Sequence, residues 1–145
     1  MPRIERSAHV AWRGSVARGS GALSAASGAF GELPVTLASR IGDPEGKTSP
    51  EELLAAAHAG CFAMSLGSEL ARDGTPPETL RVDCTIVMDE VEGRGHQIVG
   101  SRLRVEVDAA ATEEALDAAV ARADEGCPFS ALLKRAGADV EISRA

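Results

Sequence analysis

The sequence predicts an α+β fold in a single domain that spans residues 1–145. Three observations lead to this prediction. A long, almost uncharged helical stretch begins after Ser49, two segments with alternating apolar residues follow it, and short strand-like segments separated by glycines precede it. Strands and helices that are grouped along the chain are typical of α+β domains. The length of 145 residues suits one domain with a core of ordinary size.

The first third of the chain is expected to form short strands joined by turns. Ala8–Arg13 and Pro34–Ser39 are the expected strands, with a hairpin punctuated by Gly19, Gly21 and Gly28. The sequence Gly-Asp-Pro-Glu-Gly at residues 42–46 predicts a loop. Arg40 therefore follows a predicted strand and precedes a glycine-containing loop.

The long helix has clear start and stop signals. Ser49 suits the N-cap, Pro50 suits the first helical position, and Ser49 with Glu52 forms a capping box. The helix is expected to run to about Arg72 and to stop at Gly74. Because it is apolar on all sides, we expect it to be central and covered on every side.

The second half of the chain predicts a strand hairpin followed by helices and a last strand. Apolar residues alternate with polar ones over 80–88 and 99–107, and a Glu-Gly-Arg-Gly turn at 92–95 makes the pair antiparallel. Helices are expected over 112–124 and 128–135, and a final strand over 140–142.

Composition restricts the possible partners. The net charge of −7 gives no basic footprint for nucleic acid or an anionic membrane, so neither is expected as a partner. The uncharged run Leu53–Ser68 is shorter than the ~20 apolar residues that span a bilayer, and the first ten residues contain no signal-peptide core. We therefore expect a cytoplasmic protein whose three cysteines are reduced at rest.

The three cysteines differ in their expected reactivity. Cys61 lies within the long helix, where burial raises a thiol pKa, and by position alone it is best interpreted as inert. Cys127 precedes Pro128 and lies near a helix N-terminus, where the dipole favours a thiolate. Cys84 alternates with apolar strand residues and is expected to be structural.

His58 precedes Cys61 by one helical turn. The face expected to carry Cys61 comprises Leu54, Ala57, His58, Met64 and Ser65, with Phe62 and Leu66 on the opposite side. A Cys–His pair could activate a nucleophile or bind metal, but zinc needs about four ligands and few candidates are present. A packed core histidine is the favoured interpretation of His58.

Two motifs resemble the OsmC branch of the OsmC/Ohr thiol peroxidases. They are the stretch KTSPEELLAAAHAGCFAM at residues 47–64 and Gly-Cys-Pro at residues 126–128. The resemblance implies reduction of organic hydroperoxides without haem, metal or another cofactor. It assigns Cys61 as the peroxidatic cysteine and Cys127 as the resolving cysteine that forms a disulfide with it. A dithiol, such as a dihydrolipoyl group, would then reduce this disulfide.

The resemblance also assigns Arg40 as the arginine that stabilises the thiolate and Glu51 as the glutamate that holds this arginine. If the chain followed the Ohr branch, Arg18 would replace Arg40. Glu51 and Cys61 are ten residues apart on one helix, or about 15 Å along its axis. A second subunit with an antiparallel helix would shorten this gap, so we expect a homodimer, and the family fold implies an intertwined α+β dimer with sheets around a central helix.

Two other functions remain open at the level of sequence. A non-enzymatic redox sensor or hydrophobic-ligand-binding protein could use the same fold, with an apolar pocket as its site. A zinc-binding module centred on His58 is the third possibility.

Overall fold

The computed structural model describes residues 1–145, which form two compact units, Met1–Pro50 and Glu51–Ala145. Together they contain ten helices and strands of mixed α and β type, as predicted. The organisation of residues 1–145 as one domain stays a prediction. Each unit is described by itself below.

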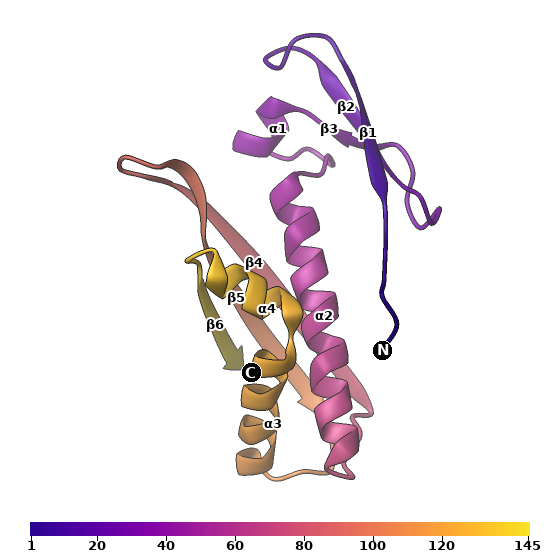
Figure 1. Ribbon diagram of the computed structural model, residues 1–145, viewed down its shortest axis with the longest axis vertical. Helices are drawn as coiled ribbons and strands as arrows, with labels where there is room; N and C mark the ends of the chain where they lie inside the picture. The colour runs from indigo at the N-terminus through magenta and orange to yellow at the C-terminus, as the bar shows by residue number, and fades with distance from the viewer. The chain divides into compact units, whose positions relative to one another are not determined.

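The first unit contains a small antiparallel sheet. Its strands are β1 (Ala8–Arg13), β2 (Ser20–Ala25) and β3 (Leu33–Val35), in the order β1-β2-β3 (Figure 1). Trp12 on β1 pairs with Gly21 on β2. A Cβ atom at Gly21 would lie 2.7 Å from Trp12 Cε3, so the indole ring requires a residue without a side chain there.

The expected strand over 34–39 was wrong beyond Val35. Helix α1 (Leu37–Ile41) begins there because Thr36 and Ser39 form a reciprocal capping box. The Thr36 hydroxyl accepts a hydrogen bond from the Ser39 backbone N–H at 3.0 Å. Arg40 consequently lies on the last turn of a short helix rather than after a strand.

Helix α2 (Pro50–Arg72) has the predicted bounds. Gly74, where it was expected to stop, has a φ of +79°, which suits the residue after a helix end. The buried residues of α2 recur at every fourth position: His58, Phe62, Leu66 and Leu70. The predicted grouping was therefore wrong in one respect, because it set His58 opposite Phe62 and Leu66, with which His58 shares the buried stripe.

The second unit has a three-stranded sheet of β4 (Thr79–Val91), β5 (Gly95–Asp108) and β6 (Asp139–Arg144). Strands β4 and β5 form the predicted antiparallel hairpin and extend further than the alternation indicated. Strand β6 pairs with β5 in parallel. Parallel neighbours need a long crossover connection, and here α3 and α4 supply it.

Helices α3 (Glu113–Gly126) and α4 (Pro128–Arg135) follow β5, and with α2 they cover one face of the sheet (Figure 1). Thr112 caps α3. One core cluster joins the three helices to the sheet; its fully or almost fully buried members are Phe62, Leu66, Leu70, Leu103, Val105, Leu116, Ala119, Ala123 and Cys127. Cys127 thus belongs to the main core of this unit.

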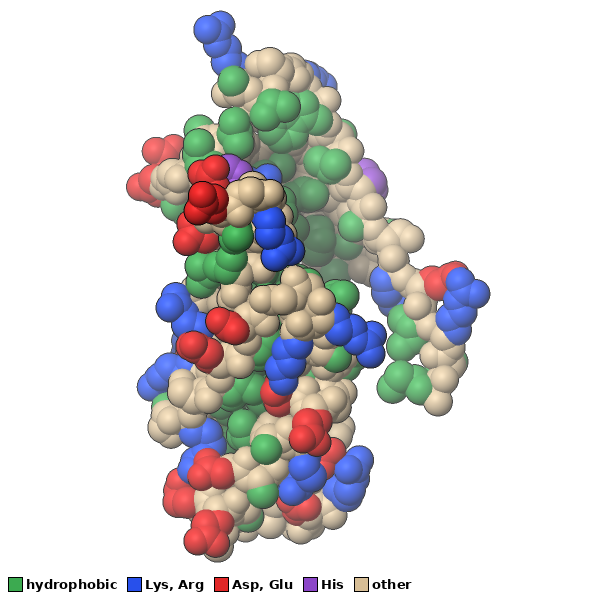
Figure 2. Space-filling view, turned by 60° about the vertical axis from the view of Figure 1, so that its left-hand side comes forward, with side chains coloured by type: hydrophobic (Ala, Val, Ile, Leu, Met, Phe, Trp, Pro, Cys, Tyr) green, Lys and Arg blue, Asp and Glu red, His purple; other side chains and the backbone are tan.

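Part of α2 is left exposed, contrary to the prediction that it is covered on every side. Met64 is 72% exposed, and only one stripe of the helix is buried. By length and composition α2 could cross a bilayer, a test that the central helix of a soluble protein also passes. In Figure 2, Lys and Arg side chains are interspersed with Asp and Glu side chains over the lower part of the visible face.

Candidate active site

Two thiols from different helices meet in the second unit. The Sγ atoms of Cys61 on α2 and Cys127 at the start of α4 are 3.4 Å apart, and neither cysteine forms a disulfide. Cys127 is fully buried, whereas Cys61 is partly exposed. The Cys61 sulfur is therefore accessible to a small molecule, whereas the Cys127 sulfur is enclosed by the protein.

Local sequence explains why Cys127 is held at this point. It is both the C-cap of α3 and the N-cap of α4, with Pro128 at the first position of α4. Its Sγ accepts a hydrogen bond from the Ser130 backbone N–H at 3.5 Å. The Cys127 sulfur occupies the position that a capping oxygen usually takes. Its hydrogen bond from the backbone therefore limits how far the side chain can move.

Burial raises the pKa of the Cys61 thiol above its ordinary value. The adjacent Cys127 sulfur raises this pKa further, while a hydrogen bond from the Phe129 backbone N–H lowers it. In the second unit by itself, Cys61 therefore favours the protonated form. A thiol in this state needs a further source of positive charge before it can act as a nucleophile at neutral pH.

A buried polar cluster lies beside the thiol pair. His58 is fully buried, and its Nδ1 atom is hydrogen-bonded to Ser101 Oγ of β5 at 2.7 Å. Its Nε2 atom is hydrogen-bonded to Ser130 Oγ of α4 at 2.8 Å. A neutral imidazole has one donor and one acceptor nitrogen, and rotating hydroxyls can satisfy both. His58 is thus a bridge between the sheet and α4.

Cys84 adjoins the same cluster from β4. Its Sγ lies 3.3 Å from Ser101 Oγ and 4.0 Å from His58 Nδ1. Burial raises the pKa of Cys84, and the hydrogen bond with Ser101 opposes this effect. It packs against the core cluster, as expected of a structural cysteine.

No group of three or more His, Cys, Asp and Glu side chains is arranged to hold a metal ion. Both nitrogens of His58 are already bonded to serine hydroxyls. The residues around His58 therefore do not fit the tetrahedral site that zinc prefers.

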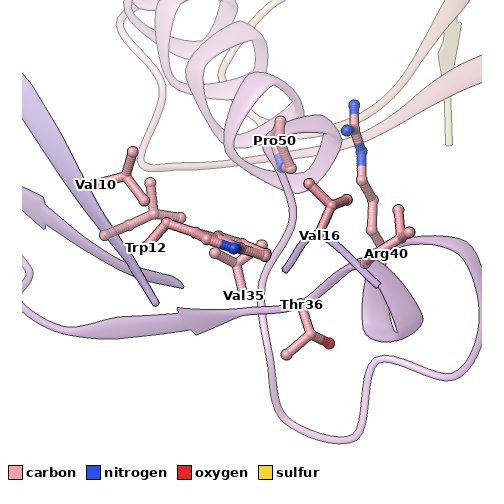
Figure 3. Close-up of a pocket in the computed structure, with 9 residues that line it drawn as sticks. Val10, Trp12, Val16, Val35, Thr36, Arg40 and Pro50 are labelled. Atoms are coloured by element: carbon pink, nitrogen blue, oxygen red, sulfur yellow. The ribbon is translucent and has the colours of Figure 1, made fainter. Parts of the chain in front are cut away.

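The first unit contains an apolar cavity of about 330 Å³. Trp12, Val16 and Val35 line it, and Arg40 extends from α1 at its edge (Figure 3). Arg18 lines a different cavity of about 360 Å³, whose lining is about equally polar and apolar. Of the two candidate arginines, only Arg40 is thus part of the apolar cavity.

The structure brings together two of the four predicted site residues, Cys61 and Cys127. Arg40 belongs to the first unit and Glu51 begins the second. Ser101 and Ser130 were missed by sequence reasoning. Ser101 falls on the apolar face of the strand alternation, between Val99 and Leu103, and this is the one signal that could have drawn attention to it.

The buried histidine makes stability depend on pH. Burial lowers the pKa of His58 below 6.5; Asp124 opposes this effect and Lys134 adds to it. The unfolded chain therefore takes up a proton near pH 6.5 that the folded protein resists, and stability is lost as the pH falls below that value. We expect the unfolding free energy to fall by up to about 1.4 kcal/mol per pH unit from this residue.

Urea unfolding of the wild type and His58→Gln across this range checks the effect. The variant lacks the titrating ring, so its unfolding free energy should fall less steeply. Equal slopes for the two proteins would contradict the assignment to His58.

Comparison with known proteins places this geometry in a family. The profile of the family described as "OsmC-like protein" matches residues 42–143. The chain is 33% identical over 132 residues to peroxiredoxin OsmC of Escherichia coli (strain K12), covering 90% of this chain and 91% of that protein. Both cysteine motifs lie within the matched residues 42–143.

Solved structures show the same fold. An organic hydroperoxide resistance protein OsmC from Legionella pneumophila matches with a TM-score of 0.78 at 22% identity, over 99% of each chain. OhrB of Bacillus subtilis matches with a TM-score of 0.76 at 24% identity, over 96% of this chain and 98% of that one. The expected α+β fold is thereby confirmed, and the chain belongs to the OsmC-like protein family.

Proposed function

We propose that this protein is a cysteine-based peroxidase that reduces organic hydroperoxides through Cys61 and Cys127. The single observation that carries the proposal is the thiol pair, with a partly exposed sulfur 3.4 Å from a buried one. The similarity to peroxiredoxin OsmC of Escherichia coli supports peroxide reduction as the reaction.

The first step takes place at Cys61. Its thiolate attacks the distal oxygen of the peroxide, the O–O bond breaks, and the sulfur becomes a sulfenic acid. The remaining oxygen leaves as an alkoxide, takes up a proton and departs as an alcohol. The sulfur is oxidised by two electrons, and the peroxide is reduced by the same two.

The second step uses Cys127. Its sulfur attacks the Cys61 sulfenic acid, an S–S bond forms, and the hydroxyl group leaves as water after it gains a proton. A dithiol, such as a dihydrolipoyl group, then exchanges with this disulfide, returns both cysteines to thiols and is itself oxidised. The cycle requires no bound cofactor or metal.

Arg40 and Glu51 are proposed to activate Cys61. A thiol whose pKa is raised by burial needs a nearby cation to ionise, and arginine is a permanent one. An arginine can also stabilise the charge that develops on the departing oxygen. Arg40 lies at the edge of the apolar cavity, and Glu51 is proposed to hold its guanidinium.

The proposed substrate class follows from the cavity in the first unit. Its lining by Val10, Trp12, Leu23 and Val35 suits the alkyl portion of an organic hydroperoxide better than hydrogen peroxide.

A cytoplasmic location would match the reduced state that the thiols need between cycles. A protective role against oxidative stress would then follow.

A homodimer is proposed as the working form. Glu51 and Cys61 are ten residues apart on α2, about 15 Å along its axis, so the two residues of one protomer lie too far apart to share a site. The exposed apolar side of α2, which includes Met64, offers a surface for a second copy. An antiparallel α2 from a partner would bring a second Glu51 towards Cys61.

The apolar cavity also favours a second candidate function, in which the protein binds a hydrophobic ligand or senses oxidation without turnover. The two functions differ in stoichiometry. A peroxidase consumes many equivalents of hydroperoxide in the presence of a dithiol, whereas a sensor consumes one.

Substitution of each thiol tests the catalytic scheme. We expect Cys61→Ser to abolish consumption of cumene hydroperoxide, because the attacking sulfur is lost. Cys127→Ser should complete one turnover and then stop, with Cys61 oxidised beyond the sulfenic acid. Peroxide consumption and mass spectrometry of the protein measure both effects. Cys84→Ser is the control and should keep its turnover, while multiple turnovers in Cys61→Ser would contradict the scheme.

The two arginines provide a matched pair. We expect Arg40→Met to raise the pKa of Cys61 and to slow peroxide reduction at neutral pH about a hundredfold, because the thiolate loses its counter-charge. Arg18→Met should leave the rate close to that of the wild type. The pH dependence of Cys61 alkylation gives the pKa, and stopped-flow assays give the rate. The reverse ranking of the two variants would reassign the role to Arg18.

The dimer is tested by sedimentation. The wild type should sediment at twice the mass of the chain, and Met64→Glu should sediment as a folded monomer with reduced turnover, because a carboxylate is costly to bury in an apolar interface. Met64→Leu keeps the apolar contact and should remain dimeric. A monomeric wild type with full activity would rule out the shared site.

A further inference from the structure

We propose that His58 is a positioning residue, which holds the Cys127 sulfur beside Cys61 through its hydrogen bond to Ser130. The proposal deepens the proposed function and rests on the Cys61–Cys127 scheme. It gives a role to a buried polar cluster that no step of that scheme uses.

The geometry contains two matched contacts between α2 and α4. On α2, His58 and Cys61 are three residues apart; at the start of α4, Cys127 and Ser130 are also three apart. Residues three apart lie on the same face of a helix. His58 contacts Ser130 at 2.8 Å and Cys61 contacts Cys127 at 3.4 Å, so the imidazole bond and the thiol pair are neighbouring contacts between the same two segments.

Ser130 transmits the position of His58 to the sulfur. Its hydroxyl bonds the imidazole, and its backbone N–H donates to Cys127 Sγ at 3.5 Å. One residue in the first turn of α4 thus binds both the histidine and the resolving cysteine. A change in the His58–Ser130 contact would therefore alter the position of the Cys127 sulfur through Ser130 alone.

Helix α4 depends on such contacts. It has eight residues, too few to be stable alone, and its buried residues are Ser130 and Leu133. If the Ser130 hydroxyl is removed, a nitrogen of His58 stays unpaired while α4 is docked, whereas water can reach it when the first turn lifts away. The loss therefore favours the lifted state, in which the sulfurs are apart.

Ser101 provides a matched control on the other side of the ring. It is fully buried like Ser130 and bonds His58 at 2.7 Å, but it belongs to β5. Ser101→Ala and Ser130→Ala remove the same group and one histidine bond each, and Ser101→Ala also removes the contact with Cys84 Sγ. Only Ser130→Ala breaks the connection to α4.

The test measures how readily the Cys61–Cys127 disulfide forms in mixtures of reduced and oxidised glutathione. Each protein disulfide converts one oxidised glutathione into two reduced molecules, so the equilibrium needs no peroxide. We expect Ser130→Ala to lower the equilibrium constant about tenfold, because an unpaired buried nitrogen penalises the docked state. Ser101→Ala should stay close to the wild type in this equilibrium while losing similar unfolding stability.

Two substitutions of His58 repeat the test from the other partner. A Gln amide reaches about as far as Nε2 and can bond Ser130, whereas an Asn amide reaches only as far as Nδ1 and can bond Ser101. We expect His58→Gln to keep most of the wild-type equilibrium constant and His58→Asn to resemble Ser130→Ala. This comparison also serves if either serine variant fails to fold.

The outcomes separate this proposal from the proposed function. If the wild type forms the disulfide and Ser130→Ala forms it equally well, or if Ser101→Ala lowers it as much, the positioning role of His58 is wrong while the thiol scheme stands. If the wild type forms no Cys61–Cys127 disulfide, the scheme itself is wrong, and the positioning role is overturned with it.

Discussion

The packing of one stripe of α2 into the core of the second unit is the interaction on which the site depends. Phe62, Leu66 and Leu70 recur at every fourth position and join one cluster with Leu103 and Val105 of β5. From the other side this cluster includes Ala119 and Ala123 of α3, whose small side chains allow a close approach of the two helices. The Ser65 hydroxyl donates to the Ala123 carbonyl at 2.8 Å, which fixes the end of α3 next to α2 and delivers Cys127 to Cys61.

The sequence predicted most elements because their signals are local. Three such signals are the Pro50 start of α2 with two acidic residues in its first turn, the alternation in β4 and β5, and the Cys127-Pro128 start of α4. Helix α1 was missed because its capping box, Thr36 with Ser39, lies inside a segment that resembles a strand. The parallel pairing of β6 with β5 depends on how the chain returns after α4, and no local pattern encodes it.

The two cysteines of the site were predicted from motifs, whereas the residues around them are evident only from the structure. The phase of α2 was misjudged because the helix is apolar on all sides, so periodicity does not identify its buried stripe. Ser101 and Ser130 are small polar residues with no distinctive spacing, and only the fold places both against His58. Contacts between residues that are distant in sequence are the feature of the site that one amino-acid sequence does not reveal.

Cys127 is both the C-cap of α3 and the N-cap of α4, and this limits how its sulfur can move. Its sulfur is 3.4 Å from that of Cys61, whereas a covalent S–S bond is about 2.05 Å long, so closure requires a displacement of about 1.4 Å. The interior of a packed domain yields little, so this displacement falls on the side-chain torsions of the two cysteines and on the backbone where α3 ends and α4 begins. In the proposed cycle, this part of the chain would therefore move once when the disulfide forms and once again when it is reduced.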